Sequence, residues 1–204
     1  MAISNATKYL GATLDSDLNF DDQITQLCTS TARALGVISR VKRLLPTAVR
    51  KVLIDALVIS RLDYCDLLLL CSKKGSLQRL QQLQNRAAKI ALGVKNRFSS
   101  EDALKLLDWL PLEQRRTYHL GIEVFKSVRQ LGPTYMSDLI AANQKFHGYD
   151  TRSSHVLPRL TGPGQKSFSY LGTKLWSVIP ATVKIASSLE SFKSGLFRHL
   201  QIPV

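Results

Sequence analysis

Hydrophobic residues recur every three or four positions over most of the first two-thirds of the chain. Beyond Asp21 this spacing puts the apolar side chains on one face of a helix. Asp21 or Asp22 is expected to cap the helix, and Pro46 to end it. The apolar positions that carry the pattern are Ile24, Leu27, Cys28, Leu35, Ile38, Val41 and Leu45.

Further helices are predicted on the same grounds. One begins near Thr47 and runs to about residue 70. Another follows the turn SKKGS, where Ser76 is expected to act as the cap, and ends at Gly93, a residue type that commonly terminates helices. Each of these helices has an apolar stripe and is expected to pack against the others.

Capping patterns place the remaining helices. Ser99 with Asp102 has the spacing of a capping box and opens a short helix. Pro111 lies where the first turn of a helix tolerates proline, and the helix that follows is expected to run to about residue 131. The sequence GPTY then starts a shorter helix, and Ser187 with Glu190 forms a second capping box near the C-terminus.

The sequence therefore predicts a mainly α-helical fold, a multi-helix bundle with a short strand remnant at the N-terminus and a loop-rich segment before the C-terminal helices. Strand is expected only near residues 8–15 and 154–159. The loop-rich segment is full of Gly, Ser, Pro and His. The predicted parts are 1–20 as an edge-strand remnant, 21–142 as the helical domain, 143–166 as the loop-rich linker and 167–204 as a C-terminal helical extension.

Composition restricts the class of protein. The chain has 204 residues, of which 45% are hydrophobic and 21% charged, as in a globular protein. Its net charge is +13. Residues 1–25 contain one Lys and four Asp, so the positive excess lies in the rest of the chain. A basic balance of this size favours a polyanionic partner, and nucleic acid in particular.

Nothing in the sequence predicts insertion into a membrane. The N-terminus lacks a basic region followed by an apolar stretch, so no signal peptide is expected. The most apolar window, at 52–71, contains Asp55, Arg61, Asp63 and Asp66, which a bilayer would exclude. The three cysteines have no Cys-x-x-Cys spacing and are expected to be free thiols in a reducing compartment. The protein is therefore expected inside the cell, in the cytoplasm or the nucleus.

The known catalytic patterns are missing from the sequence. There is no Gly-x-Ser-x-Gly, no phosphate-binding Gly-x-x-x-x-Gly-Lys and no His-Glu-x-x-His. The four histidines are scattered. The aspartates between residues 15 and 22 do not match a calcium loop, and a turn followed by a helix N-terminus accounts for them. We therefore expect no catalytic residue, no metal and no cofactor.

Basic residues form the most informative pattern. In the helix before Gly93, the spacing places a row of basic and amide side chains on one face and leucines on another. Such a row can follow a phosphate backbone without reading the sequence. A solvated helix face explains the same spacing. The candidate residues are Arg79, Arg86 and Lys89 in this row, Lys95 and Arg97 beyond Gly93, and the clusters Arg40, Lys42, Arg43 and Arg115, Arg116.

A series of phrases, in order and with similar spacing over residues 8–200, resembles a known family. The family is the reverse transcriptases of LINE-type (non-LTR) retrotransposons, of the jockey and chicken-repeat kind, and the chain is similar to their C-terminal region. The phrases are YLGATLDSDLNFDDQI, SRLDYCDLLL, LQRLQQLQNRAAKIALG, LDWLPLEQRRTYHL, GPTYMSDLI, RSS…VLPR and FSYLGTKLWSVIP…SLESFKSGLFRHL.

The resemblance implies a structure and a role. Tyr9 to Gly11 would close the polymerase palm, and the helices beyond would form the thumb and an extension that hold template and primer. The family's metal-binding aspartates lie upstream of this region and its endonuclease domain is also missing, so the chain is expected to bind an RNA or DNA duplex without catalysing polymerisation. The palm domain would be a missing partner. The alternative is a helical protein-interaction or structural module without a nucleic-acid partner.

Overall fold

The computed structural model describes residues 6–144, 164–165 and 167–201, and these residues form a mainly α-helical fold. The strand predicted at 154–159 and most of the predicted linker lie outside the described residues. The chain divides into two compact units, Met1–Glu113 and Gln114–Val204. The division falls inside the range 21–142, which sequence spacing treats as one domain, because the apolar residues form two separate buried clusters. Spacing alone does not distinguish one core from two.

The first unit opens with a β-hairpin. Strands β1 (Ala6–Tyr9) and β2 (Ala12–Asp15) pair antiparallel, with Tyr9 opposite Ala12. The two residues between them, Leu10 and Gly11, both have positive φ, which suits a two-residue hairpin turn. The segment predicted as one strand over 8–15 therefore contains the turn and folds back on itself, with Lys8 opposite Thr13.

The hairpin leads into α1 (Asp21–Val41) through a turn held by Asp15. The Asp15 carboxylate accepts hydrogen bonds from the backbone N–H groups of Asn19 (2.9 Å) and Phe20 (2.6 Å). The predicted caps Asp21 and Asp22 are wrong, since Phe20 occupies the cap position in the left-handed conformation with no side-chain cap bond. The Asp21 carboxylate instead binds the side chains of Lys73 and Ser76, at the start of α4 (Lys74–Leu92).

The helix predicted over 47–70 is broken in the structure. It consists of α2 (Thr47–Ile54), the π-helical turn η1 (Asp55–Ile59) and α3 (Ser60–Asp63), followed by the 3₁₀ segment η2 (Asp66–Cys71). The break falls at Tyr64, which is extended, and Cys65, which has a φ of 54°. The Tyr64 hydroxyl donates a hydrogen bond to the Leu10 carbonyl oxygen and so ties the break to the hairpin turn.

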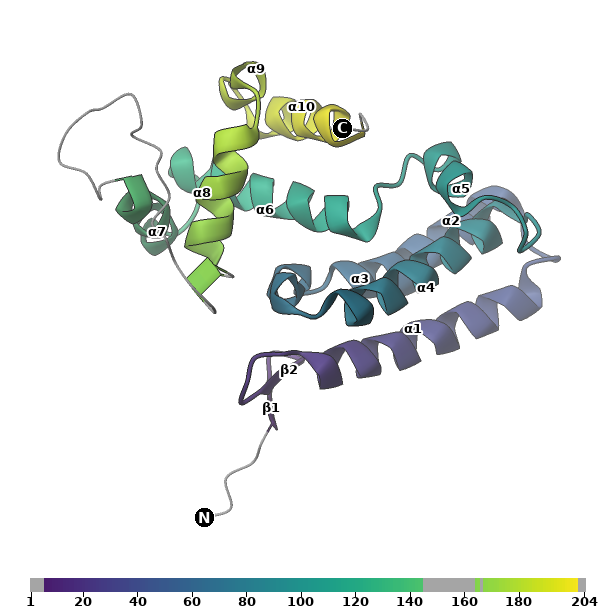
Figure 1. The fold of residues 1–204 in the computed structure, drawn as a ribbon. Helices are drawn as coiled ribbons and strands as arrows, with labels where there is room; N and C mark the ends of the chain where they lie inside the picture. The colour runs from purple at the N-terminus through teal and green to yellow at the C-terminus, as the bar shows by residue number, and fades with distance from the viewer. Residues whose placement is uncertain (1–5, 145–163, 166, 202–204) are drawn as a thin grey trace, which may run out of the picture. The chain divides into compact units, whose positions relative to one another are not determined.

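Helix α4 (Lys74–Leu92) lies at the centre of the first unit, where α1, α2 and α5 (Ser100–Leu106) all contact it (Figure 1). It begins two residues before Ser76, so the predicted cap is wrong; the Ser76 hydroxyl donates to Asp21 instead. The end at Gly93 is confirmed, with a φ of 72°. Its side facing the core carries Ala87, Ala88 and Ala91, all fully buried, whose small size lets neighbouring helices approach closely.

Two amide side chains fix the segment after α5. Gln84 is fully buried, and its amide donates to the Leu110 carbonyl oxygen at 2.9 Å. Gln81 accepts a hydrogen bond from the Leu112 N–H at 2.8 Å. At the start of α5 the predicted cap Ser99 is confirmed, because its hydroxyl accepts a hydrogen bond from the Asp102 N–H.

The second unit contains most of α6 (Leu112–Val128), together with α7 (Thr134–Gln144), α8 (Phe168–Val178), α9 (Ala181–Lys184) and α10 (Leu189–Gln201). Its core is centred on stacked Phe125 and Phe192 rings, 4.2 Å between centroids. The cap predicted at Ser187 is wrong by one residue, since Ser188 accepts from the Ser191 N–H. None of the described helices combines the length and apolar character needed to cross a membrane.

Candidate nucleic-acid interface

Helices α1 and α4 lie side by side and run in the same direction. Their N-terminal ends meet where the Asp21 carboxylate binds Lys73 Nζ (2.8 Å) and the Ser76 hydroxyl (2.9 Å). These two bonds hold the pKa of the Asp21 carboxyl below its usual value, with the bond from Lys73 as the largest cause. Because the helices are parallel, their C-terminal ends also lie together.

Arg50 on α2 joins those C-terminal ends. Its guanidinium donates to the carbonyl oxygens of Lys42 (3.0 Å) and Leu45 (2.9 Å) behind α1, and to that of Ala91 (3.1 Å) in the last turn of α4. A fourth bond goes to the Thr47 hydroxyl. The last carbonyls of a helix lack partners within the helix and carry partial negative charge. Arg50 thus satisfies both helix ends with one charged group.

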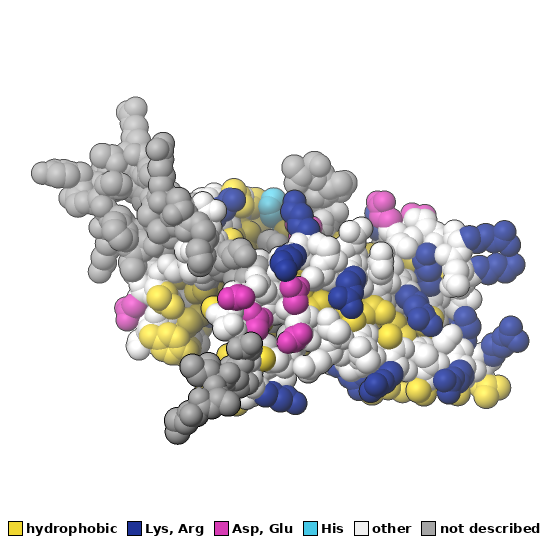
Figure 2. Space-filling model, turned by 60° about the horizontal axis from the view of Figure 1, so that its bottom comes forward, with side chains coloured by type: hydrophobic (Ala, Val, Ile, Leu, Met, Phe, Trp, Pro, Cys, Tyr) yellow, Lys and Arg dark blue, Asp and Glu magenta, His cyan; other side chains and the backbone are white. Residues whose placement is uncertain are grey.

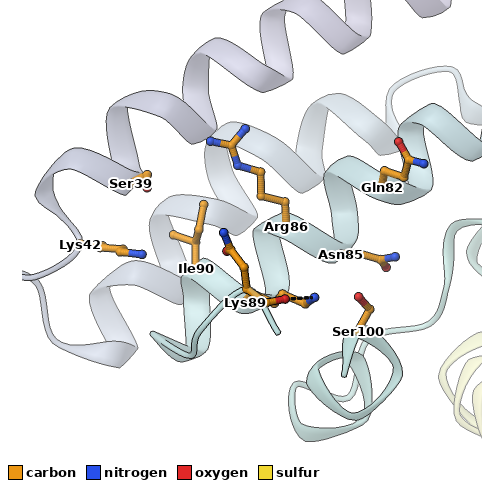
Figure 3. Close-up of a pocket in the computed structure, with 9 residues that line it drawn as sticks. Ser39, Lys42, Gln82, Asn85, Arg86, Lys89, Ile90 and Ser100 are labelled. Carbon is orange, nitrogen blue, oxygen red and sulfur yellow. Dashed lines mark hydrogen bonds between the residues drawn. The ribbon is translucent and has the colours of Figure 1, made fainter. Parts of the chain in front are cut away.

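A pocket of about 420 Å³ lies between the C-terminal halves of α1 and α4, and we call it the α1–α4 pocket. Figure 3 shows Lys42 extending from α1 toward Ile90, with Arg86 and Lys89 on α4 and Ser100 at the start of α5. Amide side chains line the pocket together with the cations, and none of its lining residues is acidic. The lining residues are Ser39, Lys42, Gln82, Asn85, Arg86, Lys89, Ile90, Asn96 and Ser100.

A second pocket of about 380 Å³ adjoins the first at Lys42 and Asn96, beside the loop that follows α4. We call it the loop pocket. Four of its seven lining residues are cations. The lining residues are Lys42, Arg43, Arg50, Gly93, Val94, Lys95 and Asn96.

Five of the ten predicted cations line the two pockets. Lys42, Arg86 and Lys89 line the α1–α4 pocket, and Lys42, Arg43 and Lys95 line the loop pocket. Arg40 and Arg97 are exposed and line neither pocket.

Three predicted residues lie elsewhere. Arg79 is exposed nearer the N-terminal end of α4, close enough to Asp21 for its charge to lower the pKa of that carboxyl. Arg115 and Arg116 belong to the second unit, and Arg116 is only 3% exposed. A guanidinium so deeply buried does not form part of a phosphate-binding surface in this structure.

The pocket cations are not neutralised by acidic partners. Within residues 6–144, 164–165 and 167–201, no ion pair involves Lys42, Arg43, Arg86 or Lys95, and Lys89 donates to the Asn96 carbonyl oxygen at 2.8 Å. Lysines elsewhere are paired, as in Lys105 with Glu101 at 2.7 Å. The positive charge of the pockets is therefore available to a ligand.

Charge is segregated along the α1–α4 pair. In Figure 2, Lys and Arg side chains gather over the C-terminal ends of the two helices, and a group of Asp and Glu side chains lies nearer the N-terminal ends. The acidic end includes Asp15, which is engaged with backbone N–H groups. A polyanion would therefore be attracted more strongly to the C-terminal ends of the two helices than to their N-terminal ends.

Comparison of the chain with models of protein families, with curated proteins and with solved structures found no match.

Three residues of this surface, Asn85, Asn96 and Arg50, were not among the candidates from the sequence. The two amides were left out because the candidates were all cations, although Asn85 follows Gln82 by three positions and this spacing places both on one face of a helix. Arg50 bonds to backbone carbonyls of distant residues, and no pattern in the sequence indicates this role.

Proposed function

We propose that the chain binds a nucleic-acid duplex, RNA or DNA, through the cations of the α1–α4 pocket and the loop pocket. The observation that supports this most is the convergence of Lys42, Arg86 and Lys95 from two helices and a loop, none with an acidic partner among the described residues. Cations held in this way favour the displacement of counterions from phosphates. The whole sequence also has a net positive charge of +13, which favours a polyanionic partner.

The proposed role is that of a thumb-like region of a LINE-type reverse transcriptase, which holds template and primer without performing the chemistry. The support for this part is the order of sequence phrases described above. We assign no catalytic residue, metal or cofactor to these 204 residues. The palm would be the part of the polymerase that supplies the catalytic carboxylates.

The amides beside the cations fit a surface that binds nucleic acid irrespective of its base sequence. Gln82, Asn85 and Asn96 each offer both a donor and an acceptor next to charged groups. Phosphate and sugar oxygens are the commonest targets of such side chains, and they carry no sequence information. We therefore expect duplexes of unrelated sequence to bind with similar affinity.

A double replacement on α4 tests the proposal. The α4 variant carries Arg86→Gln and Lys89→Gln, which both line the α1–α4 pocket, and its matched control carries Lys105→Gln and Lys174→Gln, which remove the same charge elsewhere. Fluorescence anisotropy with a labelled duplex of about two turns, roughly 20 base pairs, would compare the affinities. We expect the α4 variant to bind about tenfold more weakly or worse, and the control to stay within about threefold of the parent. Equal weakening in both would mean that only net charge matters.

A protein-interaction module is the second candidate, because one observation favours it. Several large apolar side chains on α1, α2 and the link between them are exposed, with Leu44 at 83%, Val52 at 65% and Val37 at 60%. Solvent-exposed apolar side chains gathered on neighbouring elements are typical of protein-binding surfaces. This candidate predicts that the parent protein binds duplex no better than the α4 variant does.

A further inference from the structure

The loop pocket differs from the α1–α4 pocket in ways that point to a more specific ligand. A duplex backbone is a continuous row of phosphates, each with a single negative charge, and it needs cations spread along a surface. In the loop pocket, Lys42, Arg43, Arg50 and Lys95 instead surround one space of about 380 Å³. Four cations around one space suit a single group with more than one negative charge.

The need to neutralise helix ends does not account for all four cations. Arg50 already donates to the carbonyl oxygens of Lys42, Leu45 and Ala91. No hydrogen bond or ion pair from the Arg43 and Lys95 side chains occurs within the described part of the chain, and both are exposed. These two side chains are free to turn toward a ligand, while Arg50 is fixed in the pocket wall.

Backbone geometry opens the pocket at Gly93. This residue has a φ of 72°, and a Cβ atom built on it would lie 2.7 Å from Arg50 Nη2. Without a side chain there, the guanidinium lies directly against the loop. Of the five N–H donors of a guanidinium, the four hydrogen bonds above leave one on Nη2.

We propose that the loop pocket binds a terminal phosphate monoester, the group found at the end of a nucleic-acid strand. At neutral pH a monoester carries a charge of about −1.5 to −2 and three acceptor oxygens, in contrast to the single charge of a backbone phosphodiester. The inference rests on the proposed function, because the α1–α4 pocket would hold the duplex that leads to this end. Arg43 and Lys95 would contact the phosphate, with Lys42 shared between the two pockets.

The test compares duplexes that differ only at their ends. A duplex of about ten base pairs, one helical turn, would carry 5′-phosphate, 3′-phosphate or hydroxyl ends. For the parent protein we expect a phosphate-ended duplex to bind about tenfold more tightly than the hydroxyl-ended one. The loop-pocket variant, Arg43→Gln with Lys95→Gln, should lose this preference. The α4 variant should bind all duplexes more weakly and keep it.

The outcomes separate this inference from the proposed function. Equal affinity for phosphate and hydroxyl ends, or a preference that persists in the loop-pocket variant, would overturn the inference and leave duplex binding untouched. If no duplex binds, the proposed function fails. Titration calorimetry with inorganic phosphate at constant ionic strength then tests whether the loop pocket by itself binds a phosphate group. Saturable binding by the parent that the loop-pocket variant lacks would support the pocket, and its absence would overturn it.

Discussion

The Arg50 Nε atom on α2 donates a hydrogen bond of 3.1 Å to the backbone carbonyl oxygen of Ala91, in the last turn of α4. The same guanidinium binds the Lys42 carbonyl oxygen just behind α1. One side chain therefore holds together the ends of the two helices that carry the candidate interface. The backbone position of Lys42, which lines both pockets, is held by this side chain.

Replacing Arg50 by Lys tests the structural part of the account. Lysine keeps the charge but cannot present several N–H donors in one plane, so most of the bonds to the carbonyl oxygens would be lost. We expect the free energy of unfolding, measured by urea denaturation, to fall by about 2 kcal/mol. The neighbouring exposed Lys51→Gln should change it by no more than about 0.5 kcal/mol. Equal effects at the two positions would show that Arg50 does not act as a clamp.

The contact of Arg50 with Gly93 leads to a second prediction. Alanine at position 93 would be strained at a φ of 72° and would place its Cβ 2.7 Å from Arg50 Nη2. We expect Gly93→Ala to lower the free energy of unfolding by more than about 1 kcal/mol. Gly75→Ala is the control, since no atom lies within 4 Å of a Cβ there; it should leave stability unchanged or raise it by up to about 1 kcal/mol. The same urea titrations measure both, and a neutral Gly93→Ala would contradict the prediction.

Asp15 gives the fold a dependence on pH. Hydrogen bonds from backbone N–H groups, that of Asn19 first, lower the pKa of its carboxyl. A pKa lower in the folded state than in the unfolded state means that the ionised form stabilises the fold. This contribution is complete above the ordinary pKa of about 3.9 and is lost as the pH falls below it.

The corresponding experiment follows the urea midpoint of the parent and of Asp15→Asn between about pH 7 and pH 3. The parent should lose more stability on acidification than the variant, because the amide has no charge to lose. The variant should already be less stable at neutral pH, where the parent carboxylate is ionised. Two curves that stay parallel down to the acid end would rule out this role for Asp15.

The buried amide of Gln84 predicts a further loss of stability. In Gln84→Leu the Leu110 carbonyl oxygen would lose its side-chain partner inside the first unit. Leaving a buried acceptor without a partner is expected to lower the free energy of unfolding by about 1–3 kcal/mol. Gln78→Leu, at an exposed position of the same helix, serves as the control and should have little effect. Comparable effects would argue against a specific role for the buried amide.

Helical spacing was enough to predict the mainly α-helical fold and the course of α1, since one apolar stripe runs along it, although α1 ends at Val41 and not at Pro46 as predicted. Gly93 and Ser99 were also predicted, because their roles depend only on local backbone chemistry. The predicted caps at Asp21 and Ser76 are wrong, because these two side chains bind each other across 55 positions of sequence. A local pattern contains no information about such a partner.

The candidate site was predicted only in part, because local spacing does not show which helices pack together. Spacing put Arg86 and Lys89 on one face of α4, but it did not show that α1 runs parallel to this helix and brings Lys42 to the same pocket. Arg116 was grouped with the surface cations, and the structure buries it in the second unit. Charge in a sequence indicates a candidate, whereas exposure depends on tertiary packing.

The central claim is that the cations of the α1–α4 pocket and the loop pocket bind nucleic-acid phosphates, and the salt dependence of duplex affinity tests it most directly. The measurement compares the parent with a variant that has Gln at the five predicted cations lining the two pockets, Lys42, Arg43, Arg86, Lys89 and Lys95, over a series of salt concentrations. We expect the parent affinity to fall steeply with salt, and the variant to have a logarithmic slope shallower by about one unit for each phosphate that it no longer binds. Unrelated duplex sequences should give the same result. An unchanged slope and affinity in the variant would contradict the claim, and these cations would then form only a solvated face.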